Sequence, residues 1–410
     1  MSKWEEKRLG EVCEKIVSGG TPSTKKQEYY KDGSICWLKT KEVTNNFIYS
    51  TEQKITEEGL NNSSAKLIPE NSVIIAMYGD GKTAGRVAVN KIPLATNQAC
   101  CNLIFNKKEV YYKFVFYNLL ARYSELVQLK LGGSQQNLNT NTIKNLKISL
   151  PMLTTQQKIG DILSTYDELI ENNNRRIELL EKVAENLYKE WFVRFRFPNY
   201  KETKFEKGMP QGWKYGKLGD SVNVTSSKRV YLSDYVEYGV PFYRSKEVIQ
   251  LSNGKAISES LYISEEKYLE FKNKYGVPKK NDILLTSVGT IGIPLLVSDN
   301  KPFYFKDGNL TWIQSSSSTE IAIYLYFWIK SDIGKQQLLS STIGTSQSAL
   351  TIEKLKNIKI VVPTDDIISE FRNFTSNIME QINNLQTQNQ NLIKQRDLLL
   401  SRLMSGKLEV

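Results

Sequence analysis

The chain is an internal duplication, and no other feature of the sequence constrains its fold as strongly. Motifs in the first half recur in the same order about 210 residues later. The matched stretches are residues 4–10 (WEEKRLG) with 213–219 (WKYGKLG), 41–43 with 246–248 (KEV in both), 71–76 with 281–286, and 134–151 with 346–363. A repeat of this length is a whole domain, because solenoid units span roughly 20 to 50 residues. We therefore predict two similar domains.

The excess of positive charge lies within the two repeats. Residues 1–153 carry 21 Lys and Arg against 14 Asp and Glu, and residues 201–363 carry 22 against 16. The stretches 154–200 and 364–410 are nearly neutral. Basic charge confined to globular units favours a polyanionic partner, with nucleic acid first, although a basic surface without such a partner gives the same counts.

Several kinds of catalytic site are disfavoured by the sequence. The chain contains no histidine, the commonest general base and metal ligand. Gly81-Lys82-Thr83 resembles the end of a phosphate-binding loop, but Ala76 stands where that motif needs its first glycine. No N-P-P-[FY] or D-P-P-Y tetrapeptide of a methyl-donor site occurs. We expect no catalytic residue, no metal and no cofactor in this chain.

The compartment is predicted from apolar runs and cysteines. The longest apolar run, residues 321–329, is shorter than the roughly 20 residues of a membrane span, and the charged start is not that of a signal peptide. Cys13, Cys36, Cys100 and Cys101 all lie in the first repeat, so no disulfide or zinc framework belongs to the shared fold. We expect buried small thiols in a soluble, cytoplasmic protein that does not bind membranes.

Each repeat is followed by a helix with a coiled-coil stripe. Seam positions with alternating spacings of four and three residues continue for more than four heptads after Pro151 and again after Pro363. They are Ile159, Leu163, Tyr166, Ile170, Asn173, Ile177, Leu180, Ala184, Leu187 and Trp191, and then Phe371, Thr375, Ile378, Ile382, Leu385, Asn389, Leu392, Arg396, Leu399 and Leu403. Both stripes are typical of long paired helices.

The polar residues in these stripes predict a register. If the helices pair antiparallel with residue numbers that sum to 562, Asn173 lies opposite Asn389 and Tyr166 opposite Arg396. A buried asparagine needs a polar partner, and one such pair can fix a register at some cost in stability. The alternative is that both asparagines only tolerate solvent.

These patterns predict an α+β fold with two similar mixed α/β domains. Short β-branched runs at residues 73–78, 148–150, 283–287 and 358–362 indicate strands. The two long helices join the domains as an antiparallel coiled coil with pseudo-two-fold symmetry. The predicted segments are a first globular domain at 1–153, a central spacer helix at 154–200, a second globular domain at 201–363 and a C-terminal helix at 364–410.

Candidate DNA contacts lie at matched positions of the repeats. Lysine and arginine after an aromatic strand or in a glycine turn suit phosphate, and serine with glutamine in a loop suits base edges, adenine in particular. The candidates are Lys39, Lys41, Lys82, Arg86, Ser134, Gln135 and Gln136 in the first repeat, and Arg244, Lys246, Thr290, Ser346 and Gln347 in the second. The competing interpretations are solvated strand ends, plain turns and helix caps at Asn139 or Thr351.

The ordered set of repeated motifs resembles the DNA-specificity subunit of type I restriction-modification systems. The resemblance covers essentially the whole chain and depends on the residues of a few short motifs. They are the Trp4 and Trp213 openings with Leu-Gly, residues 18–22 (SGGTP), Trp37 and Phe242, Gly79 with Gly85, residues 289–292 (GTIG), Asn97-Gln98, and the Pro151 and Pro363 junctions. The second repeat departs from the first, with residues 225–228 (TSSK) and 307–309 (DGN) at two of these places.

The resemblance implies a function and partners. It implies two target-recognition domains that read a split sequence of double-stranded DNA, and helices that bind two methyltransferase subunits and a restriction and translocase subunit. S-adenosylmethionine, ATP and Mg would belong to those partners. Two other hypotheses stay open: a coiled-coil scaffold that binds nucleic acid without sequence specificity, and a single-chain modifying enzyme.

Overall fold

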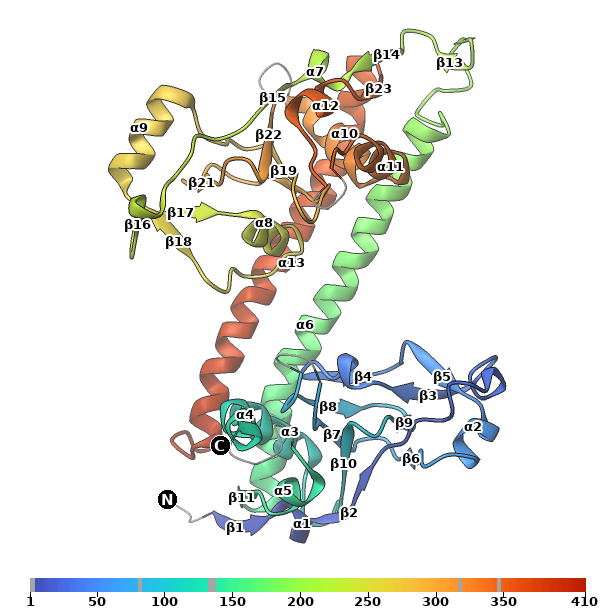
Figure 1. Cartoon of the computed structure of the whole chain (residues 1–410), viewed down its shortest axis with the longest axis vertical. Helices are drawn as coiled ribbons and strands as arrows, with labels where there is room; N and C mark the ends of the chain where they lie inside the picture. The colour runs from blue at the N-terminus through green and yellow to red at the C-terminus, as the bar shows by residue number, and fades with distance from the viewer. Residues whose placement is uncertain (1–3, 80–82, 132–137, 316–318, 345–347) are drawn as a thin grey trace. The chain divides into compact units, whose positions relative to one another are not determined.

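The computed structural model describes residues 4–79, 83–131, 138–315, 319–344 and 348–410 (Figure 1). It divides into two compact units, of which the first combines Met1–Ile170 with Leu392–Val410 and the second is Glu171–Asn391. Two long helices, α6 (Leu153–Tyr188) and α13 (Asp365–Met404), each contribute a segment to both units.

The first unit consists of mixed sheets with short helices. A five-stranded sheet has the order β2-β10-β7-β8-β4, a four-stranded sheet the order β5-β3-β9-β6, and β1 pairs with β11. The strands are β1 (Glu5–Arg8), β2 (Cys13–Ser18), β3 (Ile35–Leu38), β4 (Asn46–Ile48), β5 (Gln53–Ile55), β6 (Leu67–Ile68), β7 (Val73–Ala76), β8 (Val87–Asn90), β9 (Leu94–Thr96), β10 (Cys100–Phe105) and β11 (Lys147–Leu150). The helices are α1 (Leu9–Val12), α2 (Glu57–Asn61), α3 (Tyr112–Ala121), α4 (Tyr123–Leu131) and α5 (Thr140–Lys144).

The second unit repeats this topology. Its sheets have the orders β15-β22-β19-β20 and β16-β18-β17-β21, and β14 pairs with β23. The strands are β12 (Phe205–Glu206), β13 (Met209–Pro210), β14 (Lys214–Lys217), β15 (Asn223–Thr225), β16 (Tyr235–Val236), β17 (Val240–Tyr243), β18 (Leu261–Ile263), β19 (Ile283–Thr286), β20 (Pro294–Leu296), β21 (Tyr304–Phe305), β22 (Leu310–Gln314) and β23 (Lys359–Val362). The helices are α7 (Leu218–Ser221), α8 (Ser245–Ser252), α9 (Glu265–Tyr275), α10 (Thr319–Lys330), α11 (Asp332–Ser340) and α12 (Ile352–Lys356).

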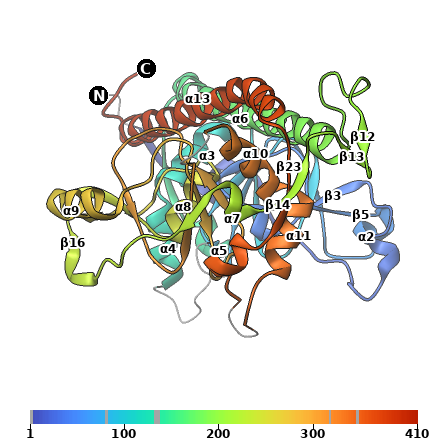
Figure 2. The same cartoon turned by 90° about the horizontal axis from the view of Figure 1, so that it is seen from above.

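The repeated Leu-Gly motif has the same role in both units. Leu9 and Leu218 are fully buried, and each donates its backbone N–H to the carbonyl just before the last strand of its repeat. The following glycine lets α1 approach α5 and α7 approach α12, because a Cβ on Gly219 would lie only 2.9 Å from the Lys356 side chain. The motif thus closes each repeat onto its own end, where β14 and β23 lie side by side in both views (Figures 1 and 2).

The duplication is not uniform. In the first unit β4 adds to the edge of the large sheet, whereas in the second the short helix α8 follows the matched strand β17. Two predicted strands are also shorter than expected, since β7 ends at Ala76 and β19 at Thr286, where the glycine turns begin. The mixed α/β class and the two long helices agree with the sequence-based prediction.

The predicted helical stripes face inward within each unit. In the first unit Ile159 and Leu163 of α6 belong to the same buried cluster as Leu400 and Leu403 of α13. In the second unit the rings of Trp191 and Phe371 lie 5.7 Å apart. A π-helical turn, Lys189–Val193, follows α6. It contains Trp191, which belongs to the same buried cluster as Phe371.

Polar seam positions are paired differently in the two units. In the second unit Asn173 Nδ2 donates to Asn389 Oδ1 at 3.0 Å, so the structure brings these asparagines together. In the first unit Arg396, expected opposite Tyr166, bonds instead to Asp167 at 2.5 Å. A guanidinium gains more from the neighbouring carboxylate than from a phenol, because opposite charges add to the hydrogen bond.

The cysteines are all free, and only Cys100 and Cys101 are buried, whereas Cys13 and Cys36 are partly exposed. Among the described residues, no helix is long and apolar enough to cross a membrane.

Candidate nucleic-acid interface

The repeated Lys-Glu-Val motif forms a helix cap in both repeats. Glu42 accepts a hydrogen bond from the backbone N–H of Lys39 at 3.1 Å, and Glu247 accepts one from the N–H of Arg244 at 2.8 Å. Each glutamate lies at the third position of a short helix and satisfies an N–H that the helix leaves free. The motif therefore positions Lys39 and Arg244 by backbone geometry, with Lys39 Nζ also 5.4 Å from the Trp37 ring.

The lysine of each Lys-Glu-Val motif points to the surface. Lys41 Nζ lies 2.5 Å from Glu52 Oε2, and Lys246 Nζ lies 2.9 Å from Glu259 Oε2. The hydrogen bond that Lys41 donates to Glu52 raises the pKa of Lys41 above its ordinary value, which favours the charged form of this lysine. Such exposed pairs contribute little stability, and a phosphate can replace the carboxylate as the partner.

Arg244 is the more constrained of the candidate cations. Its Nε and NH2 atoms donate to the two carboxylate oxygens of Glu247 at 3.1 and 2.7 Å. Burial alone raises the pKa of Glu247, but the hydrogen bonds from Arg244 outweigh burial and hold that pKa below its ordinary value. These two hydrogen bonds orient the guanidinium. Its remaining N–H groups are the candidates for DNA contacts.

The glycine turns that follow β7 and β19 hold two further candidates. Arg86 is partly exposed after Gly85, whose positive φ of 87° favours glycine. Thr290 is exposed between Gly289 and Gly292, which also have positive φ. Both turns follow buried strands, but Arg86 comes after the second glycine of its turn, whereas Thr290 lies between the two glycines of the other.

Six of the predicted contacts lie outside the described residues. They are Lys82, Ser134, Gln135, Gln136, Ser346 and Gln347. The caps that follow these loops are described, since Asn139 accepts from the N–H of Thr142 and Thr351 from that of Lys354. Both stretches therefore lead directly into a capped helix, as the competing interpretation predicts.

Two motifs that distinguish the repeats lie against each other, which sequence reasoning missed. In the first repeat Gly20 N–H donates to Thr96 at 2.8 Å, and Thr21 bonds to Gln98. In the second repeat the matched loop has Arg229 Nε 3.2 Å from Asp307 Oδ2. Because the two loops of a repeat contact each other, both differ between the first and the second repeat. This joint difference was the signal in the sequence that could have indicated the contact.

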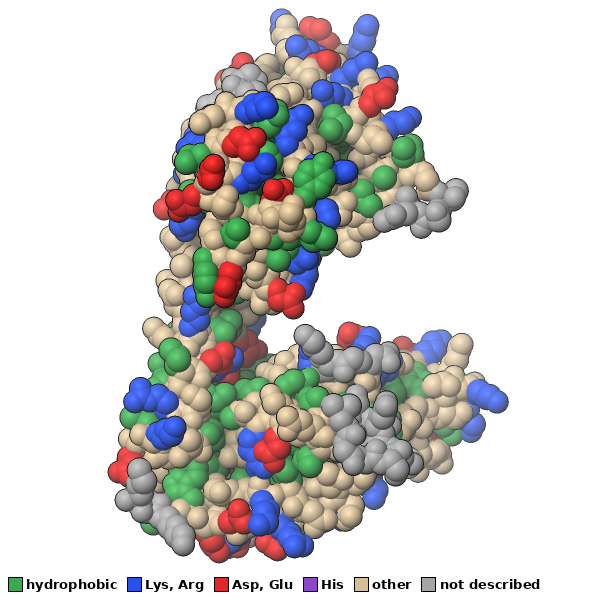
Figure 3. Space-filling view, turned by 60° about the vertical axis from the view of Figure 1, so that its left-hand side comes forward, with side chains coloured by type: hydrophobic (Ala, Val, Ile, Leu, Met, Phe, Trp, Pro, Cys, Tyr) green, Lys and Arg blue, Asp and Glu red, His purple; other side chains and the backbone are tan. Residues whose placement is uncertain are grey.

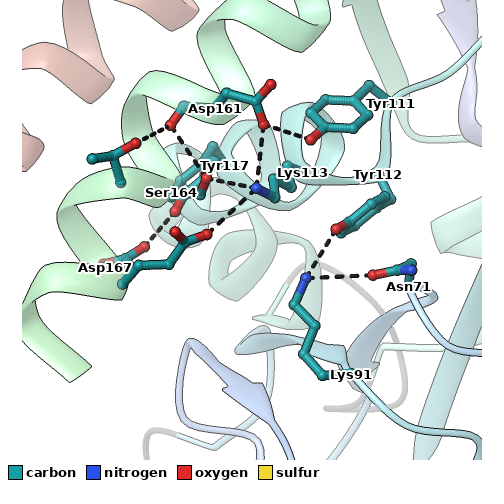
Figure 4. Close-up of polar contacts among 11 residues, drawn as sticks. Asn71, Lys91, Tyr111, Tyr112, Lys113, Tyr117, Asp161, Ser164 and Asp167 are labelled. Atoms are coloured by element: carbon teal, nitrogen blue, oxygen red, sulfur yellow. Dashed lines mark hydrogen bonds and ion pairs between the residues drawn. The ribbon is translucent and has the colours of Figure 1, made fainter. Parts of the chain in front are cut away.

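The first unit also has polar contacts between α3 and α6 (Figure 4), which Arg396 of α13 extends. Tyr117 donates to Asp167 Oδ2, and Arg396 donates to the other oxygen of that carboxylate. Lys113 Nζ lies 3.2 Å from Asp161 Oδ1 and 2.7 Å from Ser164 Oγ. Burial, followed by the charge of Asp167, raises the pKa of Tyr117 far above its ordinary value, so the phenol remains a donor.

The face of the molecule that Figure 3 shows carries both signs of charge, with lysine and arginine interspersed among acidic and apolar side chains. Within the described residues, no group of three or more cysteine, aspartate or glutamate side chains could hold a metal ion. The candidate residues carry ammonium, guanidinium, amide and hydroxyl groups, which form hydrogen bonds and phosphate contacts.

The structure thus defines a chain of two similar mixed α/β domains, each with cationic loops and each followed by a long helix. The family model described as Type I restriction modification DNA specificity domain matches residues 1–182 and 210–395. The chain belongs to this family, and DNA recognition is the function that the family defines.

Similar proteins support this assignment. The type I restriction enzyme MjaIX specificity subunit of Methanocaldococcus jannaschii is 31% identical over 419 residues, which cover 99% of this chain and 94% of that protein. The EcoR124I/EcoR124II specificity subunit of Escherichia coli is 33% identical over 190 residues, which cover 44% of this chain and 46% of that protein. The crystal structure of a type I restriction-modification S subunit from M. genitalium has a TM-score of 0.62 at 17% identity, covers 98% of this chain and 96% of that one, and supports the fold alone.

Proposed function

We propose that the chain is a non-catalytic subunit that recognises a bipartite sequence of double-stranded DNA. Each repeat reads one half-site, and the long helices bind the other subunits of a type I restriction-modification complex. In this proposal two methyltransferase subunits supply S-adenosylmethionine chemistry and a translocase supplies ATP- and Mg-dependent cleavage. The complex works in the cytoplasm.

One observation carries the two-half-site proposal. The loops after β2 and β15 occupy matched positions on the same topology, yet residues 18–22 (SGGTP) differ in size and charge from residues 226–230 (SSKRV). Base edges are discriminated by the donors and acceptors that reach them, so equal scaffolds with unequal loops suit two different half-sites. A scaffold that bound DNA only through its charge would need no such difference.

The outward faces of the helices support the assembly role. Leu179 and Val183 are exposed and lie four residues apart, hence on one face of α6. Leu398 is exposed on α13. Apolar side chains outside a filled seam suit protein contacts, and we assign them to the methyltransferase subunits.

A domain exchange tests the proposal. The chain is produced with the methyltransferase subunits encoded beside it, and methylated adenines are mapped on genomic DNA. Replacing residues 1–153 with those of a relative should change one half of the target and leave the other half and the spacer unchanged. A complex that methylates without sequence preference, and binds all duplexes with equal salt-dependent affinity, would instead favour the scaffold hypothesis.

A further inference from the structure

The second unit exposes two large apolar side chains at the tip of a short turn. Tyr231 and Leu232 are 63% and 86% exposed. Val230 and Tyr235, on either side, pack against the buried cluster around Phe242. Apolar side chains held out in water between two anchored neighbours cost free energy, so they indicate a surface that meets a partner.

The tip is rigid. Tyr231 N–H donates to Asp234 Oδ2 at 2.8 Å, and a 3-10 turn, Leu232–Asp234, begins directly after it. The Tyr235 ring lies 5.4 Å from that of Phe242. A backbone held in this way loses little conformational freedom when the tip binds, which favours affinity.

The first repeat has a polar tip at the same place. Its matched 3-10 turn, Gln27–Tyr29, also lies a few residues before the matched strand, β3. Here Lys26 and Gln27 are the exposed residues, whereas Tyr29 is buried. The apolar tip is therefore a property of the second repeat and is not required by the shared fold.

Two cations, Lys228 and Arg229, lie just before the tip in the chain, and a third, Lys274, shares an aromatic contact with Lys228. Lys228 Nζ and Lys274 Nζ lie 4.9 and 5.3 Å from the ring centre of the exposed Tyr275. Arg229 is largely exposed, with one ion pair to Asp307. Aromatic and apolar side chains beside several cations match the two parts of DNA, its bases and its phosphates.

The acidic residues near the tip do not cancel this pattern. The carboxylate of Asp234 is engaged by the turn itself, and that of Asp307 by Arg229. Glu237 is exposed beyond the tip. A phosphate that replaced Asp307 as the partner of Arg229 would keep this arginine paired.

We propose that Tyr231 and Leu232 form an apolar wedge that enters between two neighbouring base pairs of the half-site bound by the second repeat. Lys228, Arg229 and Lys274 hold the adjacent phosphates. Proteins that insert such wedges partly unstack a base step and kink the duplex, which adds sequence preference through the ease of deforming that step. This inference rests on the proposed function, because it needs a DNA half-site at the second repeat.

The test measures unstacking directly. The chain with its methyltransferase subunits is added to duplexes of the methylated sequence that carry 2-aminopurine at single positions through the second half-site. The unaltered complex should raise the fluorescence several-fold at one step. The Tyr231→Ser/Leu232→Ser variant should lose this rise and bind about tenfold more weakly, as expected for loss of a buried apolar side chain. Gln27→Ser, at the matched turn of the first repeat, should leave both signals unchanged.

The outcomes separate this inference from the proposed function. Sequence-specific binding with no fluorescence rise, or a rise that the double variant keeps, overturns the wedge and leaves the proposed function intact. Loss of methyltransferase binding by the double variant in the absence of DNA, with unstacking retained, makes the tip a protein contact and also overturns the wedge. A complex without sequence preference overturns both proposals.

Discussion

Asn173 and Asn389 are hydrogen-bonded to each other at 3.0 Å and are only 8% and 6% exposed. Asn389 Nδ2 donates in turn to Asn174 Oδ1 at 2.9 Å, and Asn173 Nδ2 lies 3.5 Å from Gln388 Oε1. Four amides thus form one network across the two helices of the second unit. A shift of either helix by one heptad would separate the two asparagines and place Asn173 opposite Ile382 or Arg396, so the network favours the register of this part of the pair.

Replacement of one of these asparagines should destabilise the second unit. Asn389→Leu leaves the Asn173 amide buried without its main partner, which should lower the free energy of unfolding by about 1–3 kcal/mol in urea. The Asn173→Leu/Asn389→Leu variant should regain most of this loss. Register is measured with cysteines at Ile177 and Leu385, whose disulfide yield should fall only in the double variant. An unchanged yield would assign the register to apolar packing instead.

The Arg244–Glu247 fork should make the stability of the second unit sensitive to acid. The pKa of Glu247 in the folded state is below the ordinary value of 4.5, so the Glu247 carboxylate stabilises the fold above about pH 4.5. This stability is lost as the pH falls through the lower folded-state pKa. Glu247→Gln should therefore flatten the acid side of the stability curve, and Glu42→Gln, at the matched position without an arginine fork, is the control.

Removal of the arginine should cost more than removal of an ordinary surface cation. Arg244→Ala leaves a carboxylate that is 1% exposed without its fork, and we expect a loss of roughly 2 kcal/mol. This loss is smaller than for a fully buried ion pair because the Arg244 side chain is 35% exposed. Water screens the pair and solvates part of the carboxylate once the arginine is removed. Equal unfolding midpoints for Arg244→Ala and Lys246→Ala would contradict this assignment.

The spacing of apolar residues and the duplicated motifs predict the fold because both reflect which side chains are buried. The coiled-coil stripes could be found because each seam residue must face the partner helix, and Ile159, Leu163 and Leu403 are all buried. The strands at β7 and β19 were found for the same reason, since all four residues of each are buried. Regular elements leave a periodic signal, whatever their function.

The candidate site was less predictable because its contacts are not periodic. The bond from Arg396 to Asp167 was missed, since a charged pair one residue out of register gives no signal in a stripe of seam positions. The contact between Gly20 and Thr96 joins loops more than 70 residues apart. Such contacts depend on where the sheets place the loops, and neither repeat alone specifies that placement.

Gly19 should be irreplaceable for a steric reason. A Cβ at this position would lie 2.2 Å from the carbonyl oxygens of Thr96 and Asn97, so the loop after β2 must move away from the turn between β9 and β10. Gly19→Ala should lower the free energy of unfolding by roughly 1–3 kcal/mol and weaken recognition of the first half-site only. Ser227→Ala is the control in the second repeat, where the buried hydroxyl has no partner among the described residues. Loss of both half-sites would indicate general unfolding.

Asp167 should be the central residue of the polar contacts among α3, α6 and α13 in the first unit. Its carboxylate accepts from both Tyr117 and Arg396, and the two charged side chains are 16% and 18% exposed. Asp167→Asn should destabilise the first unit by about 2–4 kcal/mol, whereas Tyr117→Phe removes one hydrogen bond and should cost about 1 kcal/mol. A double-mutant cycle with Arg396→Met should show that the losses from Asp167→Asn and Arg396→Met are not additive. Additive losses would mean that the two groups act independently.

The surface lysines of the Lys-Glu-Val motifs should control the salt dependence of DNA binding. If Lys41 and Lys246 exchange their carboxylate partners for phosphates, each releases about one counterion. Lys41→Gln and Lys246→Gln should each reduce the slope of log affinity against log salt by about 0.9, without altering the preferred sequence. Lys182→Gln is the matched control, because Lys182 is an exposed lysine of α6 with an ion pair to Glu178 at 2.9 Å. If all three variants show the same slope as the unaltered complex, the motif lysines lie away from the DNA backbone, and the Lys-Glu-Val motif has only its capping role.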